Sequence, residues 1–296
     1  MGGTRFFGIG TVRRLVEDGH NVTVATRGLT PDSFGDSVER ITFDHRYAES
    51  IHSAFEGRHY DAVIDKIAFS SNDVKRVAEN VSFDRYILMS TCGVYGDRRG
   101  LSIGEECFDP YSYGIVWGER RWGNDTAGDF DYDEGKRQAE SAAALLLPEK
   151  KCVMVRYPVV MGRGDYTKRL RFYIEHTLSG KPMYISNLTK KVTYMYAEEA
   201  ASLFADLLGT DVSGPLNGCC DGYLTIEDIL RYTEKQTGKK AVISSEGAPA
   251  PYNGFADDTL YSNEKAKRSG IVFSEHKSWI YGLIDHYIEE LEKENI

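Results

Sequence analysis

The stretch MGGTRFFGIGTVRRLVEDGHNVTVATRG, residues 1–28, decides the fold of this chain. A glycine-rich turn leads directly into a segment whose apolar residues recur on one helical face until Gly19 closes it. The β-branched run at residues 22–25 then predicts a buried strand. A glycine turn before a helix lets a pyrophosphate approach the free N–H groups and the positive dipole end of that helix. The stretch therefore predicts the opening of a dinucleotide-binding unit.

The first half of the chain repeats this alternation of helix and strand. Strand-like apolar runs occur at residues 40–43, 62–64, 86–89 and 152–156, and helical patterns at residues 48–55, 71–80 and 137–147. Such alternation predicts a parallel sheet with helices on both faces. We expect an α/β fold: a Rossmann-like doubly wound parallel sheet over residues 1–162, and a smaller mixed substrate-binding lobe over residues 163–296.

One strand is missing from this pattern. A buried strand normally precedes such a glycine turn and lies in the middle of the sheet, but this sequence begins at the turn itself. We therefore expect the first strand to be absent, through a start site assigned too late or a shortened chain. The neighbouring strands would then keep unpaired backbone groups, which would lower stability and weaken cofactor binding.

Composition narrows the class of protein. The 296 residues are 41% hydrophobic and 27% charged, which is ordinary for a soluble globular protein. A net charge of −9 opposes nucleic-acid binding, since such binding depends on neutralising phosphates. We expect no membrane segment, because no apolar run approaches the ~20 residues needed to cross a bilayer. The five cysteines lack metal-site spacing, so we expect a cytoplasmic protein with reduced thiols and no metal.

The pair Tyr132 and Lys136 carries the candidate chemistry. The two residues are four apart at the start of a predicted helix, so their side chains share one face. A lysine ammonium beside a phenol stabilises the phenolate, which makes Tyr132 a candidate general acid and base. Thr91, at the end of the preceding strand, could hydrogen-bond the same substrate oxygen. The bare pair is a weak signal, and its position after strand and before helix strengthens it.

The residues after the second predicted strand indicate which cofactor is preferred. An NAD site usually places a carboxylate there, on the ribose 2′-hydroxyl. This chain instead has Thr26 and Arg27. A guanidinium can form charge-assisted hydrogen bonds with a 2′-phosphate, so we expect NADP or NAD as cofactor, with NADP favoured. The alternative is that Arg27 is a solvated loop residue.

With these parts in order, the chain resembles the extended short-chain dehydrogenase/reductase family, also called the NAD-dependent epimerase/dehydratase family. Gly2 to Gly8 resemble the variant glycine motif of a subgroup that includes nucleotide-sugar epimerases and RNA-associated relatives. Residues 90–96 are similar to the active-site strand end of the family, which places Thr91 at its catalytic position. Residues 156–165 resemble the segment that wraps the nicotinamide and leads to the substrate lobe.

The resemblance also implies roles for single residues. Tyr132 and Lys136 match the catalytic pair, and Asp44 matches the acidic residue that contacts adenine. The expected cofactor-binding residues, Arg27 included, are Gly2, Thr4, Arg5, Phe6, Phe7, Gly8, Arg27, Asp44, Lys66, Ile67, Ala68, Tyr157 and Val159.

The activity implied is that of a nicotinamide-dependent epimerase, dehydratase or reductase acting on a sugar-like substrate. We expect that substrate to be a nucleotide-linked sugar, held and converted at Thr91, Tyr132 and Lys136. The alternative is a catalytically weak NAD(P)-binding sensor, or an RNA-associated protein, on the same fold.

Relatives of this kind commonly pair through two helices of each subunit, so we expect a homodimer. The candidate helices are residues 71–80 and 135–147. The small side chains of Ala139, Ala142 and Ala143 suit close helix packing. The alternative is that this face packs only on the sheet of its own subunit.

Two features depart from the family pattern. The stretch between Thr91 and Tyr132 is longer than usual and contains ERRWGND at residues 119–125, which could form a lid or a partner surface. Asp133 and Glu134 place acid beside Tyr132. These carboxylates would either complement the helix dipole or raise the pKa of the phenol.

Overall fold

A computed structural model describes residues 1–96, 100–122, 128–148, 151–251 and 257–294. The helices in these ranges are α1 (Phe7–Glu17), α2 (Ala48–Phe55), α3 (Ser71–Asn80), α4 (Tyr132–Leu146), α5 (Arg171–Ser179), α6 (Ala197–Asp206), α7 (Ile226–Thr237), α8 (Glu264–Arg268) and α9 (His276–Lys293). The strands are β1 (Thr23–Thr26), β2 (Glu39–Thr42), β3 (His59–Asp65), β4 (Ser82–Thr91), β5 (Gly100–Ile103), β6 (Cys152–Tyr157), β7 (Val160–Met161), β8 (Met183–Tyr184), β9 (Met195–Tyr196), β10 (Gly214–Asn217), β11 (Ala248–Pro249) and β12 (Thr259–Tyr261). None of the described helices combines the length and the apolar character needed to cross a membrane.

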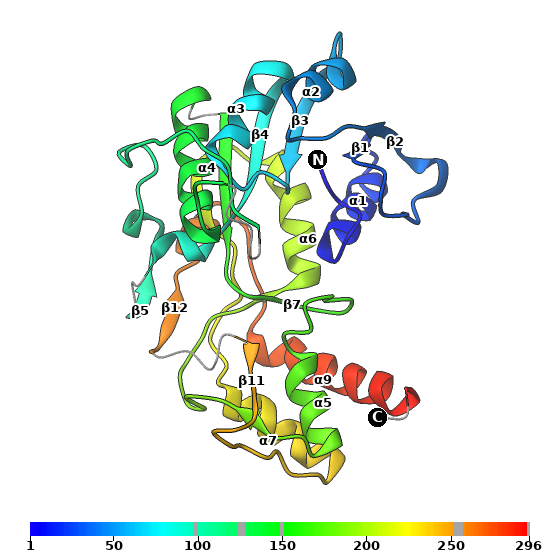
Figure 1. Cartoon of the computed structure of the whole chain (residues 1–296), viewed down its shortest axis with the longest axis vertical. Coiled ribbons are helices and arrows are strands. Elements are labelled where there is room, and N and C mark those ends of the chain that lie inside the picture. Colours follow the sequence, from blue (N-terminus) through cyan, green and yellow to red (C-terminus); the bar gives the residue numbers. More distant parts are fainter. Residues whose placement is uncertain (97–99, 123–127, 149–150, 252–256, 295–296) are drawn as a thin grey trace.

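The main sheet has four parallel strands in the order β10-β6-β4-β3 (Figure 1). Every residue of β6 is buried, which is typical of a parallel strand covered on both faces. Neighbouring residues of β4 point to opposite faces: Ile87 packs in the cluster of α6, whereas Tyr86 and Leu88 pack in the cluster of α3 and α4. The predicted α/β fold with a parallel sheet is confirmed.

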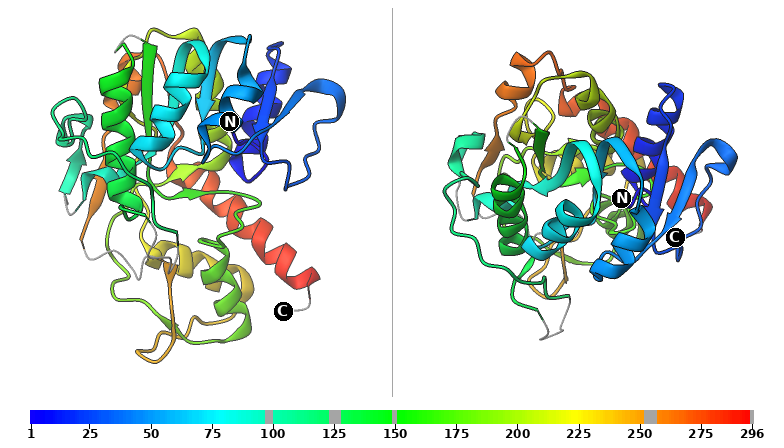
Figure 2. Two further views of the ribbon diagram at one scale, coloured as in Figure 1. Left: turned by 45° about the horizontal axis from the view of Figure 1, so that its top comes forward. Right: turned by 90° about the horizontal axis from the view of Figure 1, so that it is seen from above.

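The sheet is interrupted where the sequence predicts a missing strand. β1 and β2 form a separate parallel pair, seen beside the main sheet from above in Figure 2. The first two residues bridge the gap: the N-terminal ammonium of Met1 donates to the carbonyl oxygen of Ile64 at 2.7 Å, and the N–H of Gly2 donates to that of Ala25 at 2.9 Å. The glycine turn therefore touches both β1 and β3, although no described strand lies between them.

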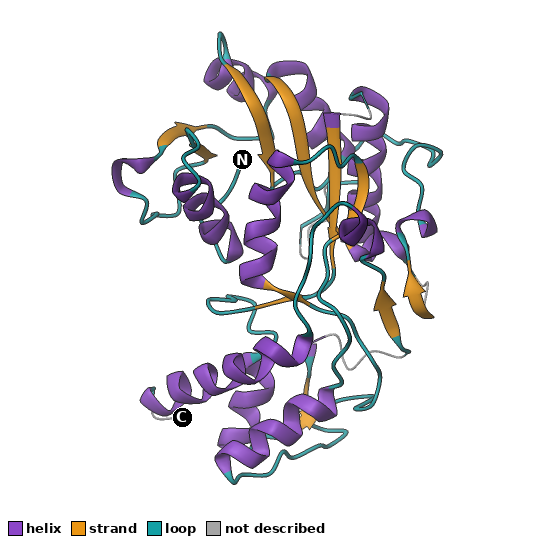
Figure 3. Ribbon diagram, turned by 180° about the vertical axis from the view of Figure 1, so that it is seen from behind, coloured by secondary structure: helices purple, strands orange, loops and turns teal. Residues whose placement is uncertain are grey.

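The second half of the chain contributes to both parts of the molecule. α6 packs on α1, and β10 pairs with β6 at the edge of the main sheet. α5, α7 and α9 pack against one another in a lobe below the sheet (Figure 3). α7 begins with a capping box between Thr225 and Asp228, and it ends at Gly238 in the left-handed conformation.

The helix face expected to pair two subunits is occupied within the single chain. Ala139, Ala142 and Ala143 of α4 are 0% exposed and lie in the core cluster that includes residues of α3 and β4. The prediction that these alanines form a subunit contact is therefore wrong, because α4 uses this face to pack on its own sheet. Leu145 and Leu146, at the end of the helix, are exposed.

Candidate active site

Three glycines shape the turn before α1. Gly2 and Gly3 have φ angles of 79° and 103°, which L side chains rarely adopt, and Thr4 follows them in a bend. A Cβ at Gly3 would lie 3.0 Å from Cγ2 of Val12, and one at Gly8 would lie 3.0 Å from Cα of Gly3. Because these glycines carry no side chain, ligand atoms can approach the N–H groups of the turn closely.

The same turn holds a strained residue. Phe6, the N-cap of α1, has φ 48° and ψ −135°, a conformation that costs a non-glycine residue roughly 1–3 kcal/mol. Its ring packs edge-on against Phe7, and Phe7 packs against Tyr157. The guanidinium of Arg5 is exposed and donates to Oγ1 of Thr30 at 3.3 Å. Aromatic packing thus holds the strained backbone while the turn presents a charged residue outward.

Lys66 places a buried cation beside this turn. Its Nζ is buried and has no hydrogen-bond acceptor among the described residues. The ammonium lies 3.9 Å from the ring centroid of Phe7 and 5.1 Å from that of Phe204, and a Cβ on Gly8 would come within 3.1 Å of it. Burial lowers the pKa of Lys66 to about 7. Ring faces attract a cation but do not replace a hydrogen bond, so an anionic ligand atom would satisfy this group.

A buried carboxylate that the sequence did not single out fixes the residues after β3. Asp65 accepts hydrogen bonds from the N–H groups of Ile67 and Ala68, at 2.9 and 3.0 Å, and from the hydroxyl of Tyr86 at 2.7 Å. Asp65 and Tyr86 are each 1% exposed. A Cβ on Gly2 would lie 3.1 Å from Cγ2 of Ile67, so this segment packs directly against the glycine turn.

Arg27 and Asp44 lie just past the carboxyl ends of β1 and β2. Arg27 is exposed, next to a turn in which Thr26 accepts a hydrogen bond from the N–H of Gly28 at 3.1 Å. Asp44 is engaged by Arg46, at 2.6 Å from Oδ2, and this hydrogen bonding lowers the pKa of Asp44 to about 2. Arg27 can therefore meet a phosphate from the solvent side, whereas Asp44 shares its carboxylate with a neighbour.

Thr91 is the last residue of β4, and Tyr132 is the first residue of α4, which packs on β4. Asp131 caps this helix by accepting a hydrogen bond from the N–H of Glu134 at 2.9 Å. The Tyr132 side chain is 38% exposed, which leaves room for a substrate to reach it. Thr91 ends β4, and its Oγ1 accepts a hydrogen bond from the N–H of Gly93 at 3.1 Å. The hydroxyl proton of Thr91 therefore remains available for donation.

The buried ammonium of Lys136 is held by backbone carbonyl oxygens. It is 0% exposed, and its Nζ donates to the carbonyl oxygens of Ala68 and Met89, at 2.7 Å each. Burial lowers the pKa of Lys136 to about 8. The ammonium lies 4.2 Å from the ring centroid of Phe69, against which the Tyr132 ring also packs at 6.1 Å. The two predicted residues thus share an aromatic neighbour, and the tuning of the phenol by the lysine stays a prediction.

Tyr157 and Val159, also expected at the cofactor, take part in packing after β6. Tyr157 is 3% exposed, and its hydroxyl donates to the carbonyl oxygen of Ala200 at 2.9 Å. The carbonyl oxygen of Val159 accepts a hydrogen bond from the N–H of Met195 at 3.0 Å. Through its contact with Phe7, the Tyr157 ring supports the glycine turn from within the core.

A buried ion pair joins β6 to α4. Nη2 of Arg156 lies 2.6 Å from Oε2 of Glu140, and both side chains are 0% exposed. Arg156 also donates to the hydroxyl of Tyr95 at 3.1 Å, and to the carbonyl oxygens of Glu105 and Phe108 at 2.9 and 3.0 Å. This network holds the loop after β4 against β6. Only a glutamate within an alanine-rich helix hinted at it in the sequence.

An arginine and three aromatic rings gather around Tyr132. The guanidinium of Arg120 lies 4.0 Å from the ring centroid of Trp122, 4.7 Å from that of Tyr132 and 4.8 Å from that of Phe69. Trp122 and Phe69 meet edge to face at 5.1 Å. Sequence reasoning noted the segment at 119–125, whose last three residues lie outside the described ranges, but not this contact with Tyr132.

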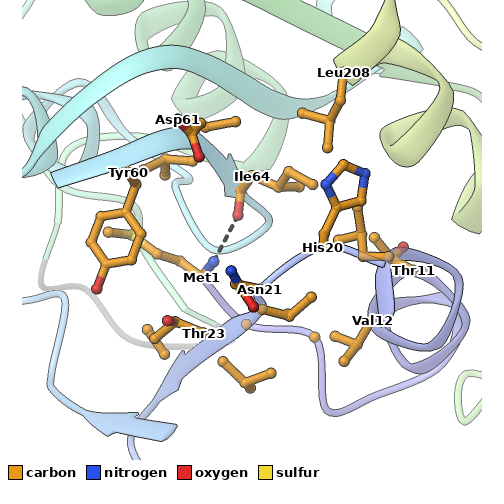
Figure 4. A pocket seen from close by; sticks show the side chains of 18 of the residues that line it. Met1, Thr11, Val12, His20, Asn21, Thr23, Tyr60, Asp61, Ile64 and Leu208 are labelled. Atoms are coloured by element: carbon orange, nitrogen blue, oxygen red, sulfur yellow. Dashed lines mark hydrogen bonds between the residues drawn. The ribbon is translucent and has the colours of Figure 1, made fainter. Parts of the chain in front are cut away.

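A cavity of about 700 Å³ separates β1 from β3 (Figure 4). Its lining includes Met1, Val12, His20 and Tyr60, together with the glycine turn. The hydrogen bond from Met1 to Ile64 lies within this lining. The candidate catalytic residues are not among the residues that line the cavity. No group of three or more His, Cys, Asp or Glu side chains in the described part of the chain is arranged to hold a metal ion.

Comparison with known proteins identifies relatives at the level of sequence. The model of the "NAD dependent epimerase/dehydratase family" matches residues 1–217. One relative is the "Chloroplast stem-loop binding protein of 41 kDa b, chloroplastic" of Arabidopsis thaliana, which is 23% identical over 258 residues. That match covers 80% of this chain and 62% of the Arabidopsis protein, so the chain spans about three fifths of the length of this relative.

Solved structures share the fold along nearly the whole chain. The UDP-glucose 4-epimerase of Thermus thermophilus in complex with NAD is 18% identical with a TM-score of 0.68, covering 96% of each chain. The UDP-glucuronic acid 4-epimerase of Bacillus cereus in complex with NAD is 16% identical with a TM-score of 0.71, covering 98% of this chain and 97% of that one. The UDP-glucose 4-epimerase of Thermotoga maritima with UDP-glucose is 14% identical with a TM-score of 0.72, covering 98% of each chain. Because the family model matches well over half of the residues, the chain belongs to the NAD-dependent epimerase/dehydratase family.

Proposed function

We propose that the protein is a nicotinamide-dependent enzyme of the epimerase/dehydratase type that acts on a nucleotide-linked sugar. The observation that carries this proposal is the meeting of two sites at the segment after β3. Lys66 lies beside the glycine turn, and two residues later the carbonyl oxygen of Ala68 accepts a hydrogen bond from Lys136. Ligands of open parallel sheets bind outside the carboxyl ends of the strands, which is where both sites lie. The UDP-sugar names of the structural neighbours support the substrate class.

The residues present fit a dinucleotide cofactor. A Cβ at Gly3 or Gly8 would be crowded at 3.0 Å, and the buried Nζ of Lys66 has no acceptor among the described residues. The pyrophosphate would be held by the N–H groups of the turn and paired with Lys66. When bound, the nicotinamide ring supplies the chemistry of accepting and returning a hydride.

The proposed cofactor preference is NADP(H) over NAD(H). Arg27 is exposed at the end of β1, where the segment Ala25–Gly28 offers no carboxylate to a ribose 2′-hydroxyl. A 2′-phosphate would form a charge-assisted hydrogen bond with Arg27. Two of the three structural neighbours described above are complexes with NAD, so this preference would distinguish the chain from them.

The chain's own residues would handle the proton. Tyr132, as the phenolate, would take the hydroxyl proton of the sugar during its oxidation and return it during reduction. Thr91 would donate its hydroxyl proton to the same sugar oxygen, because its Oγ1 already accepts the N–H of Gly93. Lys136, anchored on Ala68 and Met89, would keep positive charge behind the tyrosine.

A panel of sugar nucleotides tests this proposal. Purified protein is incubated with UDP-glucose, UDP-galactose, UDP-glucuronic acid or UDP-N-acetylglucosamine, each with NAD⁺ or NADP⁺. Chromatography of the sugar nucleotides detects an epimer or a dehydrated product, and nicotinamide absorbance detects net oxidation. We expect turnover of at least one substrate, with loss in Tyr132→Phe and no change in Tyr47→Phe, an exposed tyrosine outside the site. Equal turnover in Tyr132→Phe would contradict the mechanism.

The name of the Arabidopsis relative provides a second candidate function, the binding of RNA stem-loops. The net charge of −9 opposes it, since association with RNA depends on neutralising phosphates. A gel-shift titration with a stem-loop RNA at physiological salt compares the two functions. Submicromolar RNA binding, together with no turnover across the panel, would favour the RNA-associated function over the enzyme.

We also propose a homodimer, with a contact that differs from the buried alanines. Leu145 and Leu146 expose 63% and 37% of their surface at the end of α4, one of the two helices expected to pair the subunits. Light scattering at micromolar concentration should give twice the mass of the chain. A monomer mass, or a dimer unaffected by Leu145→Glu, would reject this contact.

A further inference from the structure

We propose that Arg120 tunes the candidate general base: its guanidinium, held against the Tyr132 ring by a separate segment, favours the phenolate and lowers the pH at which Tyr132 accepts a proton. Arg120 is then a positioning residue that acts through Tyr132. The role rests on the proposed function only in treating Tyr132 as the base of the reaction.

The contacts of Arg120 place its charge on the aromatic cluster. Its guanidinium carbon lies 4.7 Å from the ring centroid of Tyr132, with Trp122 and Phe69 at 4.0 and 4.8 Å. Negative charge on a phenolate spreads into the ring, so a cation at this distance stabilises the ionised form. Nε of Arg120 is buried and has no acceptor among the described residues. A cation that has lost part of its hydration interacts more strongly with a neighbouring negative charge than a solvated one.

The residue before Arg120 fastens the segment to α3. The carboxylate of Glu119 accepts hydrogen bonds from Nη1 of Arg76 at 2.6 Å and from Nδ2 of Asn72 at 3.0 Å. The N–H of Asn72 in turn donates to the carbonyl oxygen of Gly118 at 3.4 Å. These bonds tie Arg120 to a helix that packs directly on α4, the helix of Tyr132.

The backbone on the other side ties Arg120 to the start of α4. Arg120 forms a bridge with Phe130, and the N–H of Arg121 donates to the carbonyl oxygen of Phe130 at 2.8 Å. Gly128 has φ 109°, and a Cβ there would lie 2.9 Å from the carbonyl group of Arg120. Since Tyr132 follows two residues after Phe130, this pairing sets the distance between the guanidinium and the phenol.

Several carboxylates near the aromatic cluster oppose ionisation of Tyr132, and a cation beside its ring would offset them. Among the described residues the charged groups there include Asp131 before α4, Asp133 and Lys136 on α4, Asp73 on α3 and Asp65 at the end of β3. The carboxylates oppose ionisation of the phenol, and burial raises the pKa of Asp133. Lys136 already donates to two carbonyl oxygens. Arg120 contacts the Tyr132 ring and is placed to offset the acid that the sequence puts beside α4.

Ultraviolet titration of tyrosine ionisation tests the proposal without any substrate. The Tyr132 signal is obtained by subtracting the titration of Tyr132→Phe from that of the parent protein, in the wild type and in Arg120→Met. We expect the midpoint for Tyr132 to be about one pH unit higher in Arg120→Met, a roughly tenfold change in proton affinity. Arg120→Lys, which keeps the charge, should recover part of the shift. Arg120→Gln provides the same comparison if Arg120→Met fails to fold.

Arg121→Met is the matched control, because Arg121 is the exposed neighbour on the same segment. Its titration should overlay that of the wild type. Equal Tyr132 midpoints in the wild type and the neutral Arg120 variants overturn the proposal, as does an equal shift in Arg121→Met. The neutral Arg120 variants could shift the Tyr132 midpoint while Tyr132→Phe keeps full turnover. That result would support the effect of Arg120 on Tyr132 ionisation and contradict the role of Tyr132 in the proposed reaction, so the experiment separates the two proposals.

Discussion

Lys136 and Lys66 are both buried near the carboxyl ends of the sheet, yet they have opposite surroundings. Lys136, on the α4 side, donates to two carbonyl oxygens at 2.7 Å. Nζ of Lys66, on the glycine-turn side, lies against the faces of Phe7 and Phe204 and has no hydrogen-bond acceptor in the described part of the chain. The lysine on the α4 side is therefore satisfied by backbone acceptors, whereas the lysine on the glycine-turn side is a cation that a ligand would satisfy. The fold alone holds the lysine beside the candidate catalytic tyrosine in place, whereas the lysine beside the glycine turn would gain its hydrogen-bond partner from a bound ligand.

Tyr132→Phe acts on the α4 side and should have the largest effect. The substitution keeps the ring and its contacts with Phe69 and Arg120 but removes the proton carrier. Turnover of the true substrate should fall by about two to four powers of ten, with cofactor affinity nearly unchanged. Steady-state kinetics and cofactor titration measure the two quantities. A parallel loss of cofactor affinity would show that the two sides are not separate.

Glu140→Ala tests whether the α4 side depends on its buried charges. Removal of the carboxylate leaves Arg156 buried without its counter-ion, which should lower the free energy of unfolding by about 3–5 kcal/mol. Glu39→Ala, which breaks an exposed pair with Arg58, is the control and should change stability little. Urea denaturation compares the three proteins. Similar midpoints for both variants would mean that this side is less rigid than its contacts indicate.

Lys66→Met tests the glycine-turn side through pH. The pKa of Lys66 is about 7 in the folded protein, whereas an unfolded lysine titrates near about 10.4. Between these values the unfolded chain binds more protons, so the stability of the wild type should rise from pH 7 towards pH 10 and stay at its lower level below pH 7. The variant should lose the part of this rise that Lys66 contributes, while Lys136, whose pKa is lowered to about 8, keeps a smaller rise. At pH 6 the variant should be the more stable protein.

Lys136→Met provides the contrast for that experiment. It leaves two buried carbonyl oxygens without their donor, so it should destabilise the protein at pH 6, where Lys66→Met stabilises it. Denaturation curves at pH 6 and pH 9 measure both variants. Stability changes of the same sign at pH 6 would remove the distinction between the two lysines.

Arg27→Ala should have the smallest effect, confined to cofactor choice. Loss of a charge-assisted contact should weaken NADP(H) binding by about 1.5–3 kcal/mol and leave NAD(H) binding unchanged. Fluorescence titration with both cofactors measures the ratio. Arg13→Ala serves as a control, since the guanidinium of Arg13 donates to Oγ of Ser33 at 2.9 Å and Arg13 is not among the expected cofactor-binding residues. NAD(H) binding as tight as NADP(H) in the wild type would remove the preference.

Local sequence patterns predicted much of the fold. α2 and α3 have the bounds read from the sequence, because each is a short amphipathic helix with clear ends. β10 was missed, since Gly214–Asn217 contains a glycine and a proline and lacks a strand pattern. It is a strand because the edge of β6 needs a partner, which is a tertiary requirement.

The site was predictable in its residues but not in its contacts. Tyr132 and Lys136 are recognisable by spacing, whereas the carbonyl acceptors of Lys136 come from two segments far away in the chain. Phe69 and Arg120 join the site from separate loops, and their ring contacts leave no periodic signal in the sequence. Contacts between side chains that come together only in the folded protein could not be predicted from this single sequence.

The gap between β1 and β3 separates the main sheet from the β1–β2 pair, which should have the lower local stability. β1 and β2 pair with each other and connect to the main sheet through Met1 and Gly2, whereas β4 is paired on both edges. Segments with fewer partners open at lower free energy than the whole molecule. In hydrogen–deuterium exchange, the amides of β1 and β2 should therefore exchange early and as one group. A dinucleotide lying across the gap would contact the main sheet on one side and the more mobile β1–β2 pair on the other. Its binding should therefore slow exchange in β1 and β2 far more than in β4.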